Sequence, residues 1–305
     1  MMKRLTFALL LPVLALTTAA EEVSWLLPGH LVGKNGDARR IWLVSATTTT
    51  LRYCPSPNSP ETTEHRNSES TTVCLDETPE LAAAMNLYQA RKYTEARSKL
   101  IEVKERFKPL ADLKNNPSTL AAFYETECLR KSGDLAGLAA ARTGFSKAPL
   151  TRGNQLRQLE LDDVWDAVRM KDWQRVETLA QEWEKSRLPG DQRAQVAYCQ
   201  GLAFEALNRP EDALFAYDTA LTADAGASEE IARPAALRIL AIHHADPEVR
   251  EALRRRGAKN EDKSSAGATQ LEEAAGVARL FQLSLGAGTA LPDEFAEFLK
   301  ERSGR

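Results

Sequence analysis

The chain has 305 residues, of which 43% are hydrophobic and 27% are charged, and its formal net charge is −3. This composition is typical of a folded globular protein and argues against a disordered chain. The charge is mildly acidic, and the one basic cluster, Arg254–Arg256, fits a solvated helix face. We therefore expect neither a nucleic-acid partner nor binding to an anionic membrane surface.

Residues 1–20 have the three parts of a secretory signal peptide. Lys3 and Arg4 are basic, the stretch Leu5–Leu16 is apolar, and small residues fill positions 17–20. A membrane anchor is the alternative, but a spanning helix needs about 20 apolar residues and this stretch is shorter. We expect cleavage after Ala20, no integral membrane segment in the mature chain, and a periplasmic or secreted location.

Residues 21–77 are rich in Thr, Val and aromatic residues and poor in helix formers, which predicts a small β module. The expected strands are Arg39–Ala46, Thr49–Cys54 and Ser70–Leu75. The polar residues 56–69 are expected to form a long hairpin loop between the last two strands.

Export permits disulfide bonds that the cytosol would not. Side-chain alternation places Cys54 and Cys74 on the same side of two strands that we expect to be neighbours, so their thiols could meet. A disulfide between them and two unpaired thiols both remain open. Cys128 and Cys199 lie in helical patterns and are expected to be buried. No cysteine belongs to a metal-type doublet, and we expect neither a metal nor a cofactor.

From residue 78 the composition changes to Ala, Leu, Glu, Lys, Arg and Gln, with apolar residues three and four positions apart. Breaks in this pattern predict helices of about 12–20 residues joined by tight turns, as in stacked antiparallel pairs. We expect helical repeats over residues 78–256, a flexible polar loop at 257–267 and a helical cap at 268–305.

The segment Ala197–Leu221 resembles the tetratricopeptide repeat. Gly201 and Ala213 are small residues where two helices would cross, and Phe204 and Tyr217 would fill the space beside them. The resemblance implies a pair of antiparallel helices that stacks on similar pairs.

A second copy of this pattern is Leu81–Val103, and two weaker copies lie between them. The equivalent small positions are Ala96, Leu138, Val176 and Ala213, separated by 42, 38 and 37 residues. The family repeat is about 34 residues, and other α-solenoids have repeats of about 40–47. The chain thus resembles an exported bacterial protein with divergent tetratricopeptide-like repeats. The expected fold is mainly α, a solenoid of helical hairpins with a small N-terminal β module.

The resemblance implies that the first helix of each pair lines a concave groove, which would bind a peptide or helix of a protein partner. The groove positions fall on Tyr88, Phe123, Glu127, Arg130, Lys131, Trp165, Arg169, Tyr198 and Glu205, with Met85 and Leu202 beside them. We expect Trp165, Arg169 and Tyr198 to contribute most, because aromatic and arginine side chains dominate interface energies. The expected function is that of an exported scaffold or adaptor.

Sequence motifs of phosphate loops, serine hydrolases and zinc helices are absent, so we do not expect an enzyme. Asp162 and Asp163 are expected to lie on a hydrated helix face, and the four histidines to be structural or solvated. Two alternatives remain: a glycan or peptidoglycan binder using Trp25 and Trp42, and a non-catalytic subunit of an envelope enzyme complex.

Overall fold

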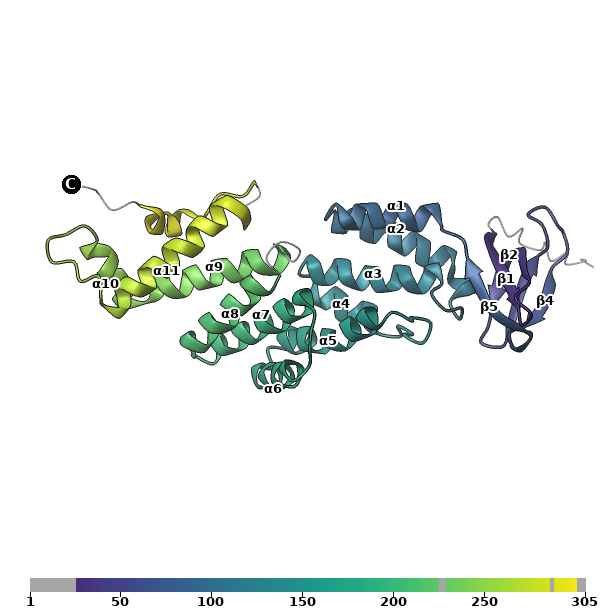
Figure 1. Cartoon of the computed structure of the whole chain (residues 1–305), viewed down its shortest axis with the longest axis horizontal. Helices are drawn as coiled ribbons and strands as arrows, with labels where there is room; N and C mark the ends of the chain where they lie inside the picture. Colours follow the sequence, from purple (N-terminus) through teal and green to yellow (C-terminus); the bar gives the residue numbers. More distant parts are fainter. Residues whose placement is uncertain (1–25, 225–228, 286–287, 301–305) are drawn as a thin grey trace, which may run out of the picture. The chain divides into compact units, whose positions relative to one another are not determined.

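The computed structural model describes residues 26–224, 229–285 and 288–300, shown as ribbons in Figure 1. The chain divides after Asp76 into an N-terminal unit and a longer C-terminal unit. The described chain is mainly helical and has one small antiparallel sheet near its N-terminus, which confirms this part of the expected fold. The expected signal peptide, residues 1–20, lies outside the described residues.

The N-terminal unit contains a five-stranded antiparallel sheet with the order β4-β3-β2-β1-β5. Its strands are β1 (Leu27–Gly33), β2 (Ala38–Ala46), β3 (Thr50–Cys54), β4 (Thr63–Arg66) and β5 (Ser70–Leu75). The three strands expected from the sequence are present. The prediction of a loop throughout residues 56–69 is wrong, because this stretch contains β4. That strand lies at the sheet edge with mostly exposed side chains, so no apolar alternation marks it in the sequence.

Alternation along the strands builds the core of this unit from one face of the sheet. Ile41 and Leu43 of the central strand β2 are fully buried, and Leu31, Leu51 and Tyr53 pack from the same face at 5% exposure or less. The opposite face carries more accessible side chains.

Cys54 and Cys74 lie on strands that are not neighbours. Cys54 of β3 is opposite Trp42 of β2, and Cys74 of β5 is opposite His30 of β1. The prediction that the two thiols face each other across one strand pair is wrong, because β2 and β1 lie between their strands. All four cysteines of the chain are free thiols.

The C-terminal unit consists of helices that pack against their neighbours along the chain (Figure 1). Five helical hairpins can be recognised among its described residues. Their first helices are α1 (Pro79–Gln89), α3 (Pro117–Lys131), α5 (Gly153–Met170), α7 (Gly190–Ala206) and α9 (Glu229–Ala245). Their second helices are α2 (Tyr93–Arg106), α4 (Leu135–Arg142), α6 (Trp173–Glu184), α8 (Pro210–Ala223) and α10 (Pro247–Arg255).

Four of the hairpin turns share one backbone geometry. In each turn a single residue has a positive φ just before the second helix: Arg91 (60°), Gly133 (77°), Lys171 (57°) and Asn208 (58°). In each, the next N–H bonds to the carbonyl five residues earlier: Lys92 to Leu87 (3.0 Å), Asp134 to Leu129 (2.9 Å), Asp172 to Ala167 (3.0 Å) and Arg209 to Phe204 (2.8 Å). This bond is the defining contact of the Schellman motif. The four turns therefore share one conformation although their sequences diverge.

The shared turn makes a prediction about stability. A non-glycine residue loses about 1 kcal/mol when it adopts the left-handed conformation, which glycine adopts freely. Lys171→Gly is expected to raise the free energy of unfolding by about 1 kcal/mol, and Gly133→Ala to lower it by about as much. A Cβ at Gly133 meets no atom within 4 Å, so only the backbone is affected. Urea denaturation measures both changes, and changes of the same sign would contradict a shared turn.

The residues that align as small positions occupy equivalent places in the structure. Ala96, Leu138, Val176 and Ala213 are each the fourth residue of a second helix, and each is at most 2% exposed. Gly201 of α7 faces α8, where an added Cβ would lie 2.5 Å from the Tyr217 ring. The two helices therefore approach closely at the glycine where the repeat pattern places a small residue.

The chain continues after α10 through a loop at 256–265 into α11 (Ala266–Leu280), a π-helical turn η3 (Phe281–Leu285) and a 3-10 helix η4 (Asp293–Leu299). The predicted end of the loop at residue 267 is wrong by two residues. Ser265 accepts a hydrogen bond from the Ala268 N–H at 3.3 Å and thereby caps α11, which begins one residue later. Phe281 and Phe298 are 1% exposed and belong to the same apolar core as α7, α8 and α9.

Candidate functional site

The residues that the resemblance assigns to the groove lie on α1, α3, α5 and α7, but four of them are buried. Phe123, Glu127, Arg130 and Trp165 are between 5% and 7% exposed. Tyr88, Lys131, Tyr198 and Glu205 are half-buried, and Arg169 is exposed. The expectation that all nine residues line an open groove is therefore wrong for the four buried ones.

A buried ion pair lies near the C-terminal end of α3. Arg130 Nε and Nη2 donate to Glu127 Oε1 and Oε2 at 3.0 and 2.9 Å, and the Tyr88 hydroxyl donates to Oε2 at 3.4 Å. Burial opposes the charge of Glu127, but the Arg130 guanidinium outweighs it and holds the pKa of Glu127 below its usual value. Burial, and then the Glu127 charge, raise the pKa of Tyr88. The cluster therefore contains a carboxylate, a guanidinium and a neutral phenol.

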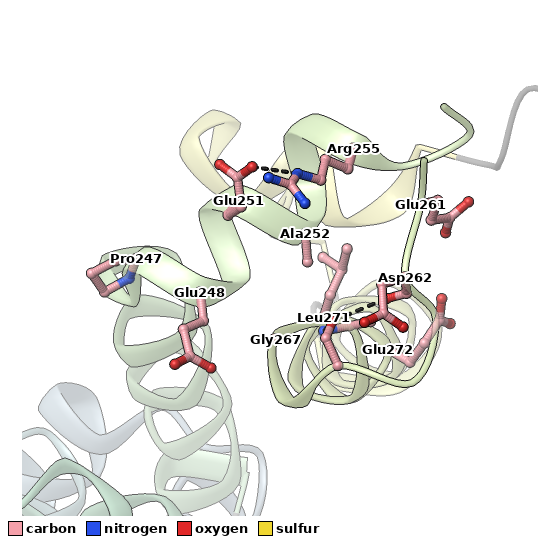
Figure 2. A pocket seen from close by; sticks show the side chains of 12 residues that line it. Pro247, Glu248, Glu251, Ala252, Arg255, Glu261, Asp262, Gly267, Leu271 and Glu272 are labelled. Atoms are coloured by element: carbon pink, nitrogen blue, oxygen red, sulfur yellow. Dashed lines mark hydrogen bonds and ion pairs between the residues drawn. The ribbon is translucent and has the colours of Figure 1, made fainter. Parts of the chain in front are cut away.

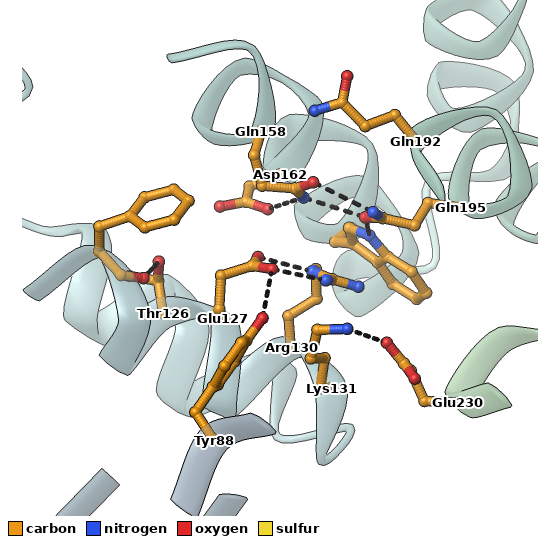
Figure 3. Close-up of polar contacts among 12 residues, drawn as sticks. Tyr88, Thr126, Glu127, Arg130, Lys131, Gln158, Asp162, Gln192, Gln195 and Glu230 are labelled. Atoms are coloured by element: carbon orange, nitrogen blue, oxygen red, sulfur yellow. Dashed lines mark hydrogen bonds and ion pairs between the residues drawn. The ribbon is translucent and has the colours of Figure 1, made fainter. Parts of the chain in front are cut away.

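A set of amides joins α5 to α7 beside this ion pair, as Figure 3 shows. Gln158 Nε2 donates to Gln195 Oε1 at 3.0 Å, and Gln195 Nε2 donates back to Gln158 Oε1 at 3.1 Å. Trp165 Nε1 donates to Gln195 Oε1 at 3.1 Å. Amide side chains carry donors and acceptors together, so the two glutamines satisfy each other without charge.

Asp162 is a buried carboxyl group that has no close ion pair among the described residues. Its side chain is 1% exposed, and Gln158 Nε2 donates to its Oδ1 at 3.0 Å. Its Oδ2 lies 4.0 Å from Arg142 Nε and accepts no hydrogen bond from the described part of the chain. Burial, and then repulsion by Glu127, raise the pKa of Asp162 to about 7 despite the opposing charge of Arg130. This carboxyl group therefore changes its charge near neutral pH.

Further polar contacts connect the first hairpin and α3 to the beginning of α9. Lys131 forms an ion pair with Glu230, and Arg91 forms one with Glu229. The Lys131 ammonium also lies 5.9 Å from the centre of the Tyr88 ring, within cation–π range. The ends of elements that are distant in sequence are thereby linked through pairs that are only partly accessible to water.

Aromatic rings extend the buried contacts toward α7 and α9. The rings of Trp165 and Tyr198 lie 6.1 Å apart, and those of Tyr198 and Tyr217 lie 5.8 Å apart. The Tyr217 hydroxyl donates to Glu205 Oε2 at 2.9 Å, and Arg238 Nη1 donates to Glu205 Oε1 at 3.0 Å. The aromatic rings are thus connected, through the Tyr217 hydroxyl and Glu205, to the exposed guanidinium of Arg238.

The accessible members of this set define what we call the first-helix surface. It comprises the half-buried or exposed residues Tyr88, Lys131, Arg169, Tyr198, Leu202, Glu205 and Arg238. The ion pair of Arg169, at 2.9 Å, is to Asp166 of its own helix. Arg169 is therefore included in this surface for its position on α5 and not for a contact with another member. The surface combines aromatic rings, one aliphatic side chain and both signs of charge.

The buried network and the first-helix surface together connect α1, α3, α5, α7 and α9. Buried polar networks of this kind fix the relative positions of the elements that they join. No protein-family model, curated protein or solved structure matches this chain. The accessible residues of the first-helix surface offer aromatic faces and paired charges to a ligand.

Several members of the network are absent from the sequence-based prediction. Gln158, Asp162 and Gln195 are buried, and the prediction that Asp162 lies on a hydrated face is wrong, although Asp163 is 53% exposed as expected. The spacing of Gln158, Asp162 and Trp165 by four and three residues places them on one helix face. That spacing next to a buried tryptophan is the signal that could have found them.

No group of three His, Cys, Asp or Glu within the described ranges could hold a metal ion. None of the helices formed by those residues has the length and apolar character needed to cross a bilayer. Trp42 is half-buried and already has the Arg40 guanidinium 5.6 Å from its ring centre, whereas Trp25 lies outside the described residues.

A separate cavity of about 320 Å³ lies between α10 and α11 (Figure 2). Ala252 of α10 and Leu271 of α11 form part of its apolar floor, and Glu248, Glu261 and Glu272 are among the carboxylates around it. It shares no residue with the first-helix surface.

Proposed function

We propose that this chain is an exported, tetratricopeptide-like solenoid that acts as a scaffold and binds a protein partner through its first-helix surface. The proposal assigns it no catalytic step and no cofactor. Its β module would provide a second contact with the partner.

The observation that carries this proposal is the recurrence of one turn in four consecutive hairpins. A shared turn gives the two helices of each hairpin a similar relative geometry. Where such hairpins stack, equivalent faces of their first helices lie beside each other. Contacts between α1 and α3, between α5 and α7, and between α7 and α9 agree with such stacking, whereas α3 and α5 are joined through α4. A row of equivalent helix faces is an extended surface suited to an extended peptide or to a helix.

The composition of the first-helix surface supports a protein ligand. Tyr198 presents an aromatic ring held between Trp165 and Tyr217, so binding it costs little conformational entropy. Arg169 and Arg238 are exposed and can form charge-assisted hydrogen bonds with carboxylates or carbonyls of a partner. Tyrosine and arginine are the residues that most often dominate binding energy at interfaces.

A capture experiment tests this function. Tagged protein is crosslinked in intact cells beside a variant carrying Arg169→Ala and Arg238→Ala, which removes two exposed cations of the first-helix surface. The matched control carries Arg175→Ala and Lys185→Ala, two exposed cations on or beside the second helix α6. We expect a partner that is captured by the parent and the control but lost with the first variant. Equal capture by all three proteins would reject this surface.

Export is part of the proposal and rests on residues 1–20. The expected mature chain begins at Glu21. N-terminal sequencing of the protein from the periplasm or the medium measures this directly. A chain that begins at Met1 and stays in the cytoplasm would contradict it.

A further inference from the structure

The cavity between α10 and α11 is bounded by both helices and by the loop that joins them. The two helices touch at their first turns, where a Cβ added to Gly267 would lie 2.4 Å from the Glu248 carbonyl oxygen. The loop contributes Glu261 and Asp262 to the wall. With about 320 Å³, the cavity is at the small end of the range of about 300–1,000 Å³ known for ligand pockets. It therefore suits one side chain and its neighbours better than a large ligand.

The floor of this cavity is apolar. Leu271 and Ala252 point toward each other between the helices in Figure 2, and Pro247 lies at one end. Ala252 is only half-buried, so part of this floor remains open to an incoming group. An aliphatic chain placed there would remove apolar surface from water.

The wall is strongly acidic. Five carboxylates line it, against one lining cation, Arg255, which pairs with Glu251 at 2.5 Å. Arg254 also pairs with Glu251, and Arg256 pairs with Glu272 at 3.8 Å, so five carboxylates face three guanidinium groups. Hydrogen bonds from Ser264 lower the pKa of Asp262, which keeps that wall carboxylate charged. Glu248 is exposed and forms no ion pair with any described residue. The remaining excess of carboxylates over guanidinium groups favours a cation over an anion.

We propose that this cavity binds a basic side chain of a protein partner, presented in a segment where arginine or lysine adjoins an apolar residue. The aliphatic stem of the basic residue lies on Leu271 and Ala252, and its charged head reaches the carboxylates of the wall. Long basic side chains combine such a stem and head, which is why they cover apolar surface while their charge stays solvated. The site is additional to the first-helix surface and does not depend on binding there.

Binding is measured with the purified mature protein and a short fluorescent peptide in which two arginines flank a pair of leucines. The control peptide replaces each arginine by citrulline, which has a similar shape but no charge. We expect the arginine peptide to bind about tenfold or more tightly than the citrulline peptide, and less tightly as salt is added. Equal affinity for both peptides, or no binding of either, would overturn the proposal.

Variants of the protein locate the site. Glu248→Gln with Glu272→Gln removes two wall charges and is expected to weaken binding of the arginine peptide about tenfold. Ala252→Arg places a cation on the floor and is expected to abolish binding. Glu182→Gln with Glu211→Gln, two exposed carboxylates on α6 and α8, is the matched control and should leave the affinity unchanged. An equal loss in the control and the wall variant would mean non-specific attraction and reject this cavity.

Discussion

Replacing Asp162 by asparagine is expected to raise the free energy of unfolding at pH 8 and to make it less dependent on pH. The Asp162 carboxyl has a folded pKa of about 7, because burial and then the Glu127 charge oppose its ionisation. In the unfolded chain the same group ionises near pH 4. Between these values the folded state retains a proton that the unfolded state has lost, so stability falls as pH rises from about 4 to about 7.

The size of the effect follows from the pKa difference. A pKa difference of one between the folded and unfolded states corresponds to about 1.4 kcal/mol. Ionised Asp162 therefore lowers the free energy of unfolding by at most about 4 kcal/mol above pH 7. An asparagine side chain at this position would still accept the hydrogen bond from Gln158, which now stands at 3.0 Å, and it carries no charge. Urea denaturation of both proteins at pH 5 and pH 8 measures the difference.

Asp163→Asn is the matched control for this experiment. Asp163 is adjacent in sequence but 53% exposed, and it pairs with Arg142 at 2.8 Å at the surface. Exposed pairs contribute about 0–1 kcal/mol, so its removal should change stability little at either pH. If Asp162→Asn gave the same small, pH-independent change as the control, the buried charge would not be present.

Replacing Arg130 by methionine is expected to lower the free energy of unfolding by about 3–5 kcal/mol. The guanidinium is 3% exposed and forms two hydrogen bonds to Glu127, so its loss leaves a buried carboxylate without its cation. Removing both charges with Glu127→Met and Arg130→Met together is expected to recover much of the loss, because neither charge of the pair then remains. Thermal or urea denaturation of the single and double variants measures the coupling.

A surface pair provides the comparison for the buried one. Lys99 and Glu102 also form a pair three residues apart, at 2.9 Å, but their side chains are 54% and 65% exposed. Lys99→Met should therefore cost less than about 1 kcal/mol. A double variant of Glu127 and Arg130 that loses as much stability as the sum of its single variants would contradict a buried, coupled pair.

The sequence was informative wherever local physics decides the outcome. The helix breaks, the equivalent positions from Ala96 to Ala213 and the strands with clear alternation follow from periodicity and turn chemistry, and the structure has them. β4 could not be recognised because an exposed edge strand carries no apolar pattern.

Long-range contacts account for the errors at the candidate site. Polar and aromatic residues such as Glu127, Arg130 and Trp165 on one helix face predict a solvated groove if that face is considered alone. The prediction fails where other helices pack on the same face. The cover comes from α5, α7 and α9, including the pair between Lys131 and Glu230, which are 99 residues apart. No local pattern in a single sequence reports such contacts. Polar residues that are buried by partners elsewhere in the chain are therefore predicted to lie at the surface.

The measurement that tests the central claim most directly is site-specific photo-crosslinking in living cells. A photoreactive residue is placed at Leu202, on the first-helix surface, or at Thr178, which is exposed on the second helix α6. The scaffold proposal predicts a crosslink from position 202 to one discrete envelope protein and none to that protein from position 178. The same crosslinks from both positions, or none from position 202 in an exported and folded protein, would contradict binding through the first helices.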